Sequence, residues 1–154
     1  MNYESITTCD VCNGKGLGVV LWVSGCDVQC KGCHNMETWD ANSGNEFTNE
    51  TLSLLIEELK RDGIERLTLT GGHPLMPCNR QQVKEIIEHV REVTPNIKIW
   101  LYTGYYYNRD MDKECKNICK MCDVVVDGPY VESLKNGKLK FRGSSNQRII
   151  KVKR

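Results

Sequence analysis

Segments with the patterns of strands and helices alternate along this chain, and no other feature of the sequence restricts its fold as strongly. Four short apolar runs, rich in β-branched residues, have the pattern of buried strands: residues 17–25, 65–72, 97–104 and 123–128. Amphipathic helix patterns lie between them at residues 47–63, 79–95 and 108–122. This order is typical of β–α–β units, so we expect an α/β protein with a parallel sheet.

The helix boundaries and the last strands are predicted from local signals. Thr48 is expected to cap the first helix and Asn79 the second, with Gln82 at the capping-box position. The apolar faces of these two helices consist of Leu52, Leu55, Ile56 and Leu59, and of Val83, Ile86, Ile87, Val90 and Val93. Residues 138–143 and 147–153 are expected to add two late strands.

The chain is predicted to form a single domain, residues 1–154, because its length and its 40% hydrophobic content suffice for one core. Two architectures fit the alternation: an open doubly wound sheet, or a shortened partial (β/α) barrel that is open on one side, which we expect. Both gather functional groups at the carboxyl ends of the strands. The segments CDVQCKGC, TGGHP and TGY each follow a strand, so we expect them on one rim.

Charge and hydropathy argue against two classes of partner. The net charge is +1, which gives no overall attraction for nucleic acid or for an anionic membrane. No apolar run approaches the roughly 18 residues of a membrane span, and residues 1–10 lack the pattern of a secretory signal. We therefore expect a cytoplasmic protein, in which the nine cysteines are thiols rather than disulfides.

Two cysteine triads share the spacing C-x3-C-x2-C, but their surroundings differ. The first, Cys26, Cys30 and Cys33, has glycines at 25 and 32, which permit a curled backbone on which three thiolates can converge. The second has the period of an amphipathic helix's inner face, formed by Met111, Cys115, Ile118, Cys119 and Cys122. Thiols on a straight helix line up along its axis, so we predict metal binding by the first triad and core packing for the second.

Three cysteine ligands would leave one metal position open. A 4Fe–4S cluster that only transfers electrons takes four cysteines, whereas an open position lets a small molecule bind, as in catalytic zinc sites. Cys9 and Cys12 form a lone C-x2-C without a second pair at zinc-finger spacing, and Cys78 is single, so all three are expected to be buried or unreactive thiols.

The triad after the first strand resembles the signature of radical S-adenosylmethionine enzymes. That resemblance implies a 4Fe–4S cluster on Cys26, Cys30 and Cys33, whose open iron is chelated by the methionine part of S-adenosylmethionine. Gly32 stands where many members have an aromatic residue, so adenine contacts there would come from the backbone. Cys33 and His34, in CHN, resemble the subset that activates glycyl-radical enzymes.

The segment TGGHP resembles the family's Gly-Gly-acid-Pro turn, which meets the methionine amino group of the cofactor. Gly71 and Gly72 can make backbone contacts of this kind, and a side chain at Gly72 is expected to crowd the cofactor. His73 replaces the acid, so a role for a carboxylate at this position is not implied.

Further segments, NGKG, TW with NSG, WLYTGY, VDGPY and FRGSSNQR, resemble in order the family of activating proteins of anaerobic ribonucleotide reductase. The resemblance implies that a reduced flavodoxin-like donor supplies an electron. A 5′-deoxyadenosyl radical is then formed and takes a hydrogen atom from a glycine of the large reductase subunit. No acid–base pair or nucleophile is required. Two alternatives stay open: an activase of another glycyl-radical enzyme, such as pyruvate formate-lyase, and a non-catalytic iron–sulfur or zinc module.

Overall fold

The computed structural model describes residues 1–153, so Arg154, at the end of the predicted domain, lies outside the described residues. Within residues 1–153 the α-helices are α1 (Asn49–Leu59), α2 (Arg80–Val93) and α3 (Lys113–Lys120). The strands are β1 (Asn2–Asp10), β2 (Gly18–Val23), β3 (Asn45–Glu46), β4 (Arg66–Gly71), β5 (Lys98–Tyr102), β6 (Val124–Asp127) and β7 (Arg148–Lys151). They form one mixed sheet with the order β3-β1-β2-β4-β5-β6-β7.

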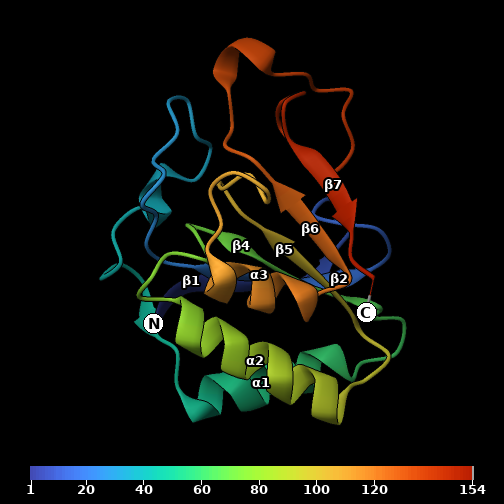
Figure 1. Cartoon of the computed structure of the whole chain (residues 1–154). Coiled ribbons are helices and arrows are strands. Elements are labelled where there is room, and N and C mark those ends of the chain that lie inside the picture. The colour runs from blue at the N-terminus through green and yellow to red at the C-terminus, as the bar shows by residue number, and fades with distance from the viewer. Residues whose placement is uncertain (154) are drawn as a thin grey trace.

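The centre of the sheet confirms the predicted α/β class. Strands β2, β4, β5 and β6 are parallel neighbours, whereas β1, β3 and β7 pair antiparallel at the two sides. The parallel strands are joined through the three helices, which lie together on one side of the sheet in Figure 1. None of the described helices combines the length and the apolar character needed to cross a bilayer.

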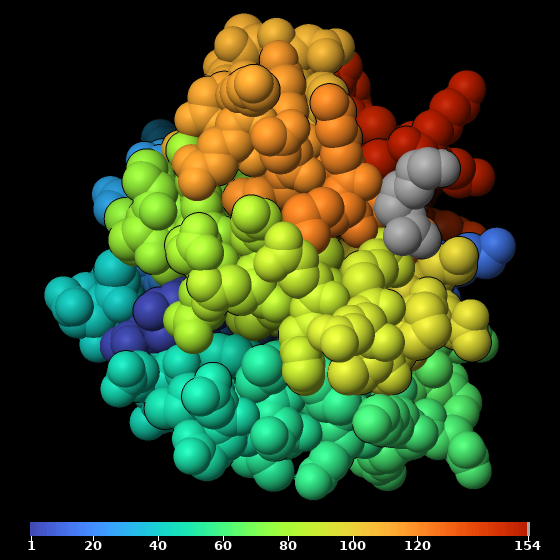
Figure 2. Space-filling view, turned by 60° about the horizontal axis from the view of Figure 1, so that its bottom comes forward, coloured from blue at the N-terminus to red at the C-terminus, as the bar shows by residue number. Residues whose placement is uncertain are grey.

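The two faces of the sheet have different neighbours. Leu67 and Leu69 of β4 belong to the core that includes Leu55 of α1 and Ile86 of α2. Figure 2 views the molecule from this side, where α1, α2 and α3 succeed one another across the surface. The alternate residues of the same strand, such as Thr70, face away from the helices. Loops rather than helices cover that second face, which leaves room for a site there.

Arg66 is fully buried on the second face and fixes the loop that contains the NGKG segment. Its guanidinium donates to the Asn13 carbonyl at 3.0 Å and forms an ion pair with Asp10 at 2.8 Å. Gly14, with φ of 144°, passes so close that a Cβ there would lie 2.5 Å from Cδ of Arg66. Close packing against Arg66 therefore accounts for a glycine in this segment.

Several boundaries differ from the sequence predictions. The strands β1 and β3 were not predicted. Residues 138–143 form no strand, because Phe141 has φ of 62°, outside the extended region, and its ring packs on Trp100. The predicted strand at 147–153 is present as β7. Helix α3 is shorter than residues 108–122, since the side chain of Asp112 accepts from the Cys115 N–H and caps the helix there.

One helix cap was predicted correctly and one was wrong. Thr48 caps α1 in a reciprocal capping box with Thr51. Asn79 makes no side-chain cap for α2, because its amide donates to the carbonyls of Ser24 and His73 at 2.9 and 3.1 Å. Gln82 donates instead to the Phe47 carbonyl. Tertiary contacts thus use the polar groups that the local pattern assigned to the cap.

Candidate functional site

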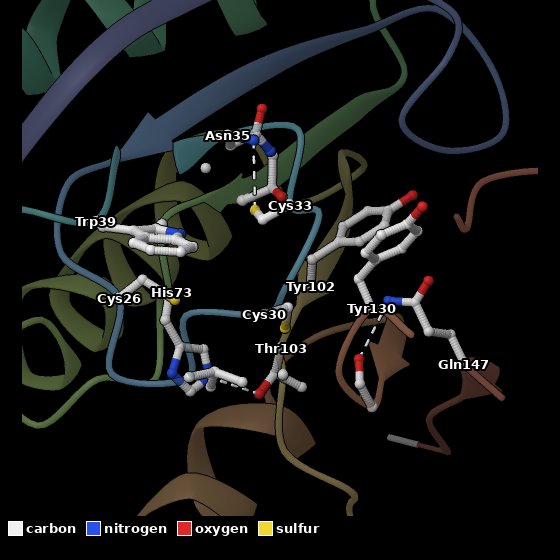
Figure 3. A pocket seen from close by; sticks show the side chains of 16 residues that line it. Cys26, Cys30, Cys33, Asn35, Trp39, His73, Tyr102, Thr103, Tyr130 and Gln147 are labelled. Atoms are coloured by element: carbon white, nitrogen blue, oxygen red, sulfur yellow. Dashed lines mark hydrogen bonds between the residues drawn. The ribbon is translucent and has the colours of Figure 1, made fainter. Parts of the chain in front are cut away.

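A pocket of about 150 Å³ lies at the carboxyl ends of the parallel strands. Its lining combines the segments expected on one rim with several others: Cys26, Val28, Cys30, Cys33, Asn35, Trp39, Thr70, Gly71, Gly72, His73, Tyr102, Thr103, Gly104, Gly128, Tyr130 and Gln147. In Figure 3, Trp39 and His73 lie on one side of the pocket and Tyr102 and Tyr130 on the other. The predicted gathering of the cysteine loop, the Gly-Gly turn and the end of β5 on one rim is confirmed.

The loop that carries the first triad curls sharply after β2. Gly25, Gln29 and Gly32 have positive φ angles of 95°, 49° and 77°. At its start, the backbone N–H groups of Gly25 and Cys26 donate to the carbonyls of Thr38 and Trp39 at 2.7 and 3.0 Å. These two bonds tie the loop to the end of the short 3₁₀ turn η1 (Met36–Thr38). The result is a non-helical backbone that turns all three thiols toward one pocket.

Burial and hydrogen bonds act in opposite directions on these thiols. Burial raises the pKa of Cys26, while the backbone N–H groups of Gln29 and Val28 lower it, with a net increase. Burial likewise raises the pKa of Cys30, against the lowering effect of the Tyr130 N–H. The N–H donors aimed at sulfur are the groups that stabilise thiolates once a metal is bound.

Three soft sulfur donors in one pocket fit an iron–sulfur cluster better than a hard cation. Across residues 1–153, no three His, Cys, Asp or Glu side chains are arranged so closely that they could hold a single metal ion as they stand. Each cysteine sulfur is placed by one side-chain torsion, and we expect rotation about that bond to accompany cluster binding. Ligation by Cys26, Cys30 and Cys33 stays a prediction.

The second triad lies in the core on the helix side of the sheet. Cys115, Cys119 and Cys122 are all fully buried, and Met111 is 6% exposed, which confirms the predicted burial. Met111 and Cys122 lie just outside α3, so the helical face itself is shorter than predicted. Burial raises the pKa of Cys119 to about 12. For Cys115, burial and a hydrogen bond to Asp112 raise it to about 11. Cys115 and Cys119 are therefore thiols rather than thiolates at neutral pH.

The Gly-Gly turn at the end of β4 packs directly on the cysteine loop. A Cβ at Gly72 would lie 2.5 Å from the Gly25 carbonyl oxygen and 2.8 Å from that of Thr38. A side chain there would therefore meet the backbone of this protein before it met any cofactor, which alters the expectation from sequence. Gly71, with φ of 104°, would bring a Cβ to 2.7 Å from the Val23 nitrogen.

The remaining predicted site residues occupy different places. His73 is 1% exposed and lines the pocket. Gly32 lies outside the lining, and a Cβ there would be 2.8 Å from the Glu132 carboxyl carbon. His34 borders a second hollow of about 380 Å³ and packs edge-on against the Tyr130 ring, with centroids 5.5 Å apart. Cys9, Cys12 and Cys78 are exposed.

The second hollow adjoins the pocket and widens it toward solvent. The two share Cys33, Asn35, Thr70, Tyr102, Tyr130 and Gln147. The hollow alone falls within the roughly 300–1,000 Å³ typical of ligand sites. One of its other walls comes from the segment between β6 and β7, which rises above the sheet in Figure 1, and the rest from Cys12, Asn13, Trp22 and His34. The site is thus a cavity with a broad entrance.

Residues 144–147 hold this wall in place. The Asn146 amide donates to the Pro129 carbonyl at 2.7 Å and to the Tyr106 hydroxyl at 2.9 Å. The Gln147 amide donates to the Gly128 carbonyl at 3.1 Å. These bonds fix the segment around Tyr130, whose N–H in turn points at the Cys30 sulfur. The GSSNQR motif therefore supports the cysteine loop through its neighbours.

Sequence reasoning did not single out the individual aromatic residues of the pocket. Trp39, Tyr102, Tyr130 and Gln147 all belong to segments on which the family resemblance rests. That shared membership is a usable signal, since four separated segments meet at one place. Asp27, which contacts His73, carries no signal beyond its position after Cys26.

Comparison with known proteins agrees with this arrangement. A family model described as "4Fe-4S single cluster domain" matches residues 12–150. The chain is 43% identical over 149 residues to the anaerobic ribonucleoside-triphosphate reductase-activating protein of Enterobacteria phage T4, covering 97% of this chain and 93% of the relative.

Proteins of the same name in two bacteria are also similar. The relative in Vibrio cholerae is 39% identical, with 97% of both chains covered. The relative in Escherichia coli K12 is 37% identical, with 96% of both chains covered. The chain therefore belongs to the family of anaerobic ribonucleoside-triphosphate reductase-activating proteins and contains a domain of the 4Fe–4S single-cluster type.

Proposed function

We propose that the protein is a radical S-adenosylmethionine activase that generates a glycyl radical on the large subunit of anaerobic ribonucleotide reductase. One observation carries the proposal: the three thiols of the cysteine loop and the Gly71–Gly72 turn line a single pocket at the strand ends. The names of the relatives favour the ribonucleotide reductase over pyruvate formate-lyase as the partner.

In this proposal Cys26, Cys30 and Cys33 hold a 4Fe–4S cluster and leave one iron open. When bound, the cluster would supply one electron to S-adenosylmethionine, whose cleavage gives methionine and a 5′-deoxyadenosyl radical that takes a hydrogen atom from the target glycine. A reduced flavodoxin-like protein would provide the electron. The reaction is an oxidoreduction, and we expect it to take place in the cytoplasm.

The protein's own residues would bind and orient S-adenosylmethionine and enclose the reaction. Backbone groups of Gly71 and Gly72 can approach a ligand closely because no side chain intervenes. The rings of Trp39, Tyr102 and Tyr130 form apolar walls that exclude water from the pocket. The adjoining hollow would admit the glycine-bearing segment of the reductase, whose binding completes the enclosure.

We also propose that the fold is a partial barrel of the radical S-adenosylmethionine type. Four parallel strands have their helices on one face and the candidate site toward the other. Such an arrangement is what a shortened barrel, open on one side, would have.

Isotope transfer tests the proposal directly. The reconstituted protein, a chemical reductant and S-adenosylmethionine are incubated without oxygen with reductase that is deuterated at glycine. We expect one 5′-deoxyadenosine per glycyl radical, with deuterium in the 5′-deoxyadenosine and the radical detected by electron paramagnetic resonance. The Cys26→Ala variant is the control without a cluster. A wild-type cluster with neither S-adenosylmethionine cleavage nor a reductase radical would instead identify a non-catalytic iron–sulfur module.

A further inference from the structure

His73 holds the chain on both sides of Cys26. Its backbone N–H donates to the Gly25 carbonyl at 2.7 Å, and its ring Nδ1 lies 2.5 Å from the Asp27 carboxylate. One residue of the Gly-Gly turn thus bonds to the residues immediately before and after the first cysteine of the triad.

The imidazole is itself held from its other edge. Nε2 lies 2.8 Å from the Thr103 hydroxyl, which also accepts the Tyr105 N–H at 3.1 Å. The Tyr105 ring packs edge-on against the imidazole, with centroids 4.3 Å apart, and its hydroxyl donates to the second oxygen of Asp27. Both ring nitrogens are therefore engaged, and the fully enclosed ring has no free nitrogen for a ligand.

The Asp27 carboxylate is well suited to this anchoring role. One of its oxygens accepts from Nδ1 of His73 and the other from the Tyr105 hydroxyl, so both are held by residues of other segments. Hydrogen bonds to a carboxylate are about twice as strong as those between neutral groups. The network connects three strand ends: that of β2 through Asp27, that of β4 through His73 and that of β5 through Thr103.

We propose that His73 is a positioning residue that acts through Asp27 to hold Cys26 at the pocket before any cluster is bound. This proposal rests on the proposed function, in which the cysteine loop binds the cluster. This role differs from direct contact between the His73 side chain and a cofactor, because the ring acts by holding Asp27.

Two substitutions at position 73 separate the links. The amide nitrogen of Asn overlays Nδ1 of histidine, so His73→Asn can keep the bond to Asp27 and loses the bond to Thr103. The amide nitrogen of Gln overlays Nε2, so His73→Gln keeps Thr103 and loses Asp27. Both variants are neutral and shrink the ring to an amide, which makes each the control for the other.

Hydrogen exchange of residues 26–33 is measured in the reduced, metal-free full-length protein. We expect exchange about tenfold faster in His73→Gln, which corresponds to loss of one charge-assisted bond, and within about twofold of wild type in His73→Asn. Asp27→Ala should exchange at least as fast as His73→Gln, because it also loses the bond from Tyr105. The double variant Asp27→Ala/His73→Gln should be no faster than Asp27→Ala, since the link to His73 is already lost there. Asp40 is an exposed carboxylate outside the loop, so in Asp40→Asn residues 26–33 should exchange at the wild-type rate.

Reconstitution adds a second readout. Iron per chain should fall severalfold in His73→Gln and stay near wild type in His73→Asn, and the electron paramagnetic resonance spectrum of the reduced cluster should broaden only in the former. Equal effects of Asn and Gln, or multiplied effects in the double variant, would overturn the positioning role. If the wild-type protein bound no cluster, the proposed function would fail, while the exchange data would still decide whether His73 orders the loop.

Discussion

The two cysteine triads have the same spacing, yet the structure puts them in opposite environments. Cys26, Cys30 and Cys33 lie on a curled loop at the rim of the sheet, whereas Cys115 and Cys119 lie on the buried face of α3 and Cys122 is buried just beyond its end. Burial raises the pKa of thiols in both triads; backbone N–H groups oppose this increase at Cys26 and Cys30, whereas a hydrogen bond to Asp112 adds to it at Cys115. Spacing alone therefore does not make a metal site; backbone conformation and nearby donors decide it.

Complete loss of iron from one triad only is the largest expected difference. Replacing Cys26, Cys30 or Cys33 by alanine should abolish cluster assembly, because each removes one of the three proposed ligands. Replacing Cys115, Cys119 or Cys122 should leave iron per chain unchanged after anaerobic reconstitution. Cys78→Ala, which removes an exposed thiol, is the control. Loss of iron in the variants of both triads would show that the two triads do not differ in metal binding.

Alkylation rates should separate buried thiols from exposed ones in the folded, metal-free protein. A thiol with a pKa of about 12 is only about one part in ten thousand thiolate at pH 8, and the thiolate is the species that reacts. Cys119 should therefore react with iodoacetamide about a thousandfold more slowly than the exposed Cys78, as followed by peptide mass spectrometry. Because its pKa is raised, the rate at Cys119 should increase with pH up to the alkaline limit of stability. Comparable rates at the two sites would mean that α3 opens in solution.

Gly72→Ala tests how tightly the first triad's loop is packed. The new Cβ would lie 2.5 Å from the Gly25 carbonyl oxygen, so the cysteine loop must move. We expect severalfold less iron per chain and a loss of about 1–3 kcal/mol in the free energy of unfolding by urea. Gly137→Ala is the matched control, since nothing lies within 4 Å of a Cβ there. Normal iron content in Gly72→Ala would indicate that the loop adapts freely.

The smallest effect is expected from packing in the second triad. The sulfur of Cys119 lies 3.7 Å from that of Met111, and Cys119→Ala removes this contact. We expect a loss of about 1–2 kcal/mol in the free energy of unfolding, with unchanged iron content. The exposed Cys9→Ala should stay within about 0.5 kcal/mol of wild type. A destabilisation equal to that of Cys9→Ala would show that Cys119 contributes little to the core.

The sequence predicts the central part of this fold well, for a physical reason. Parallel strands are buried on both sides and their helices are amphipathic, so β2, β4, β5, β6, α1 and α2 have clear apolar patterns. Strand β1 is mostly polar and none of its residues is fully buried, so its sequence lacks such a pattern. The placement of the cysteine loop beside the Gly-Gly turn follows from parallel topology alone, since carboxyl ends of neighbouring strands meet at one edge.

The rest of the site depends on contacts between distant segments. Whether Asn79 caps α2 or binds the Ser24 carbonyl is decided by the tertiary structure, and local propensity favours the cap. The link from Asp27 to His73 likewise arises only when the two turns meet. Such pairs have no periodicity or local motif, and so the sequence pattern does not reveal them.

The support that residues 144–147 give to the cysteine loop has a consequence for biosynthesis. Cys26, Cys30 and Cys33 leave the ribosome early, but the Tyr130 N–H that points at Cys30 and the Gln147 side chain in the pocket wall are made much later. A nascent chain halted before β6 would therefore present three thiols without their enclosing wall. Assembly machinery that delivers iron and sulfide should meet a finished site only after Gln147 has left the ribosome, so metallation is expected to wait for this late segment.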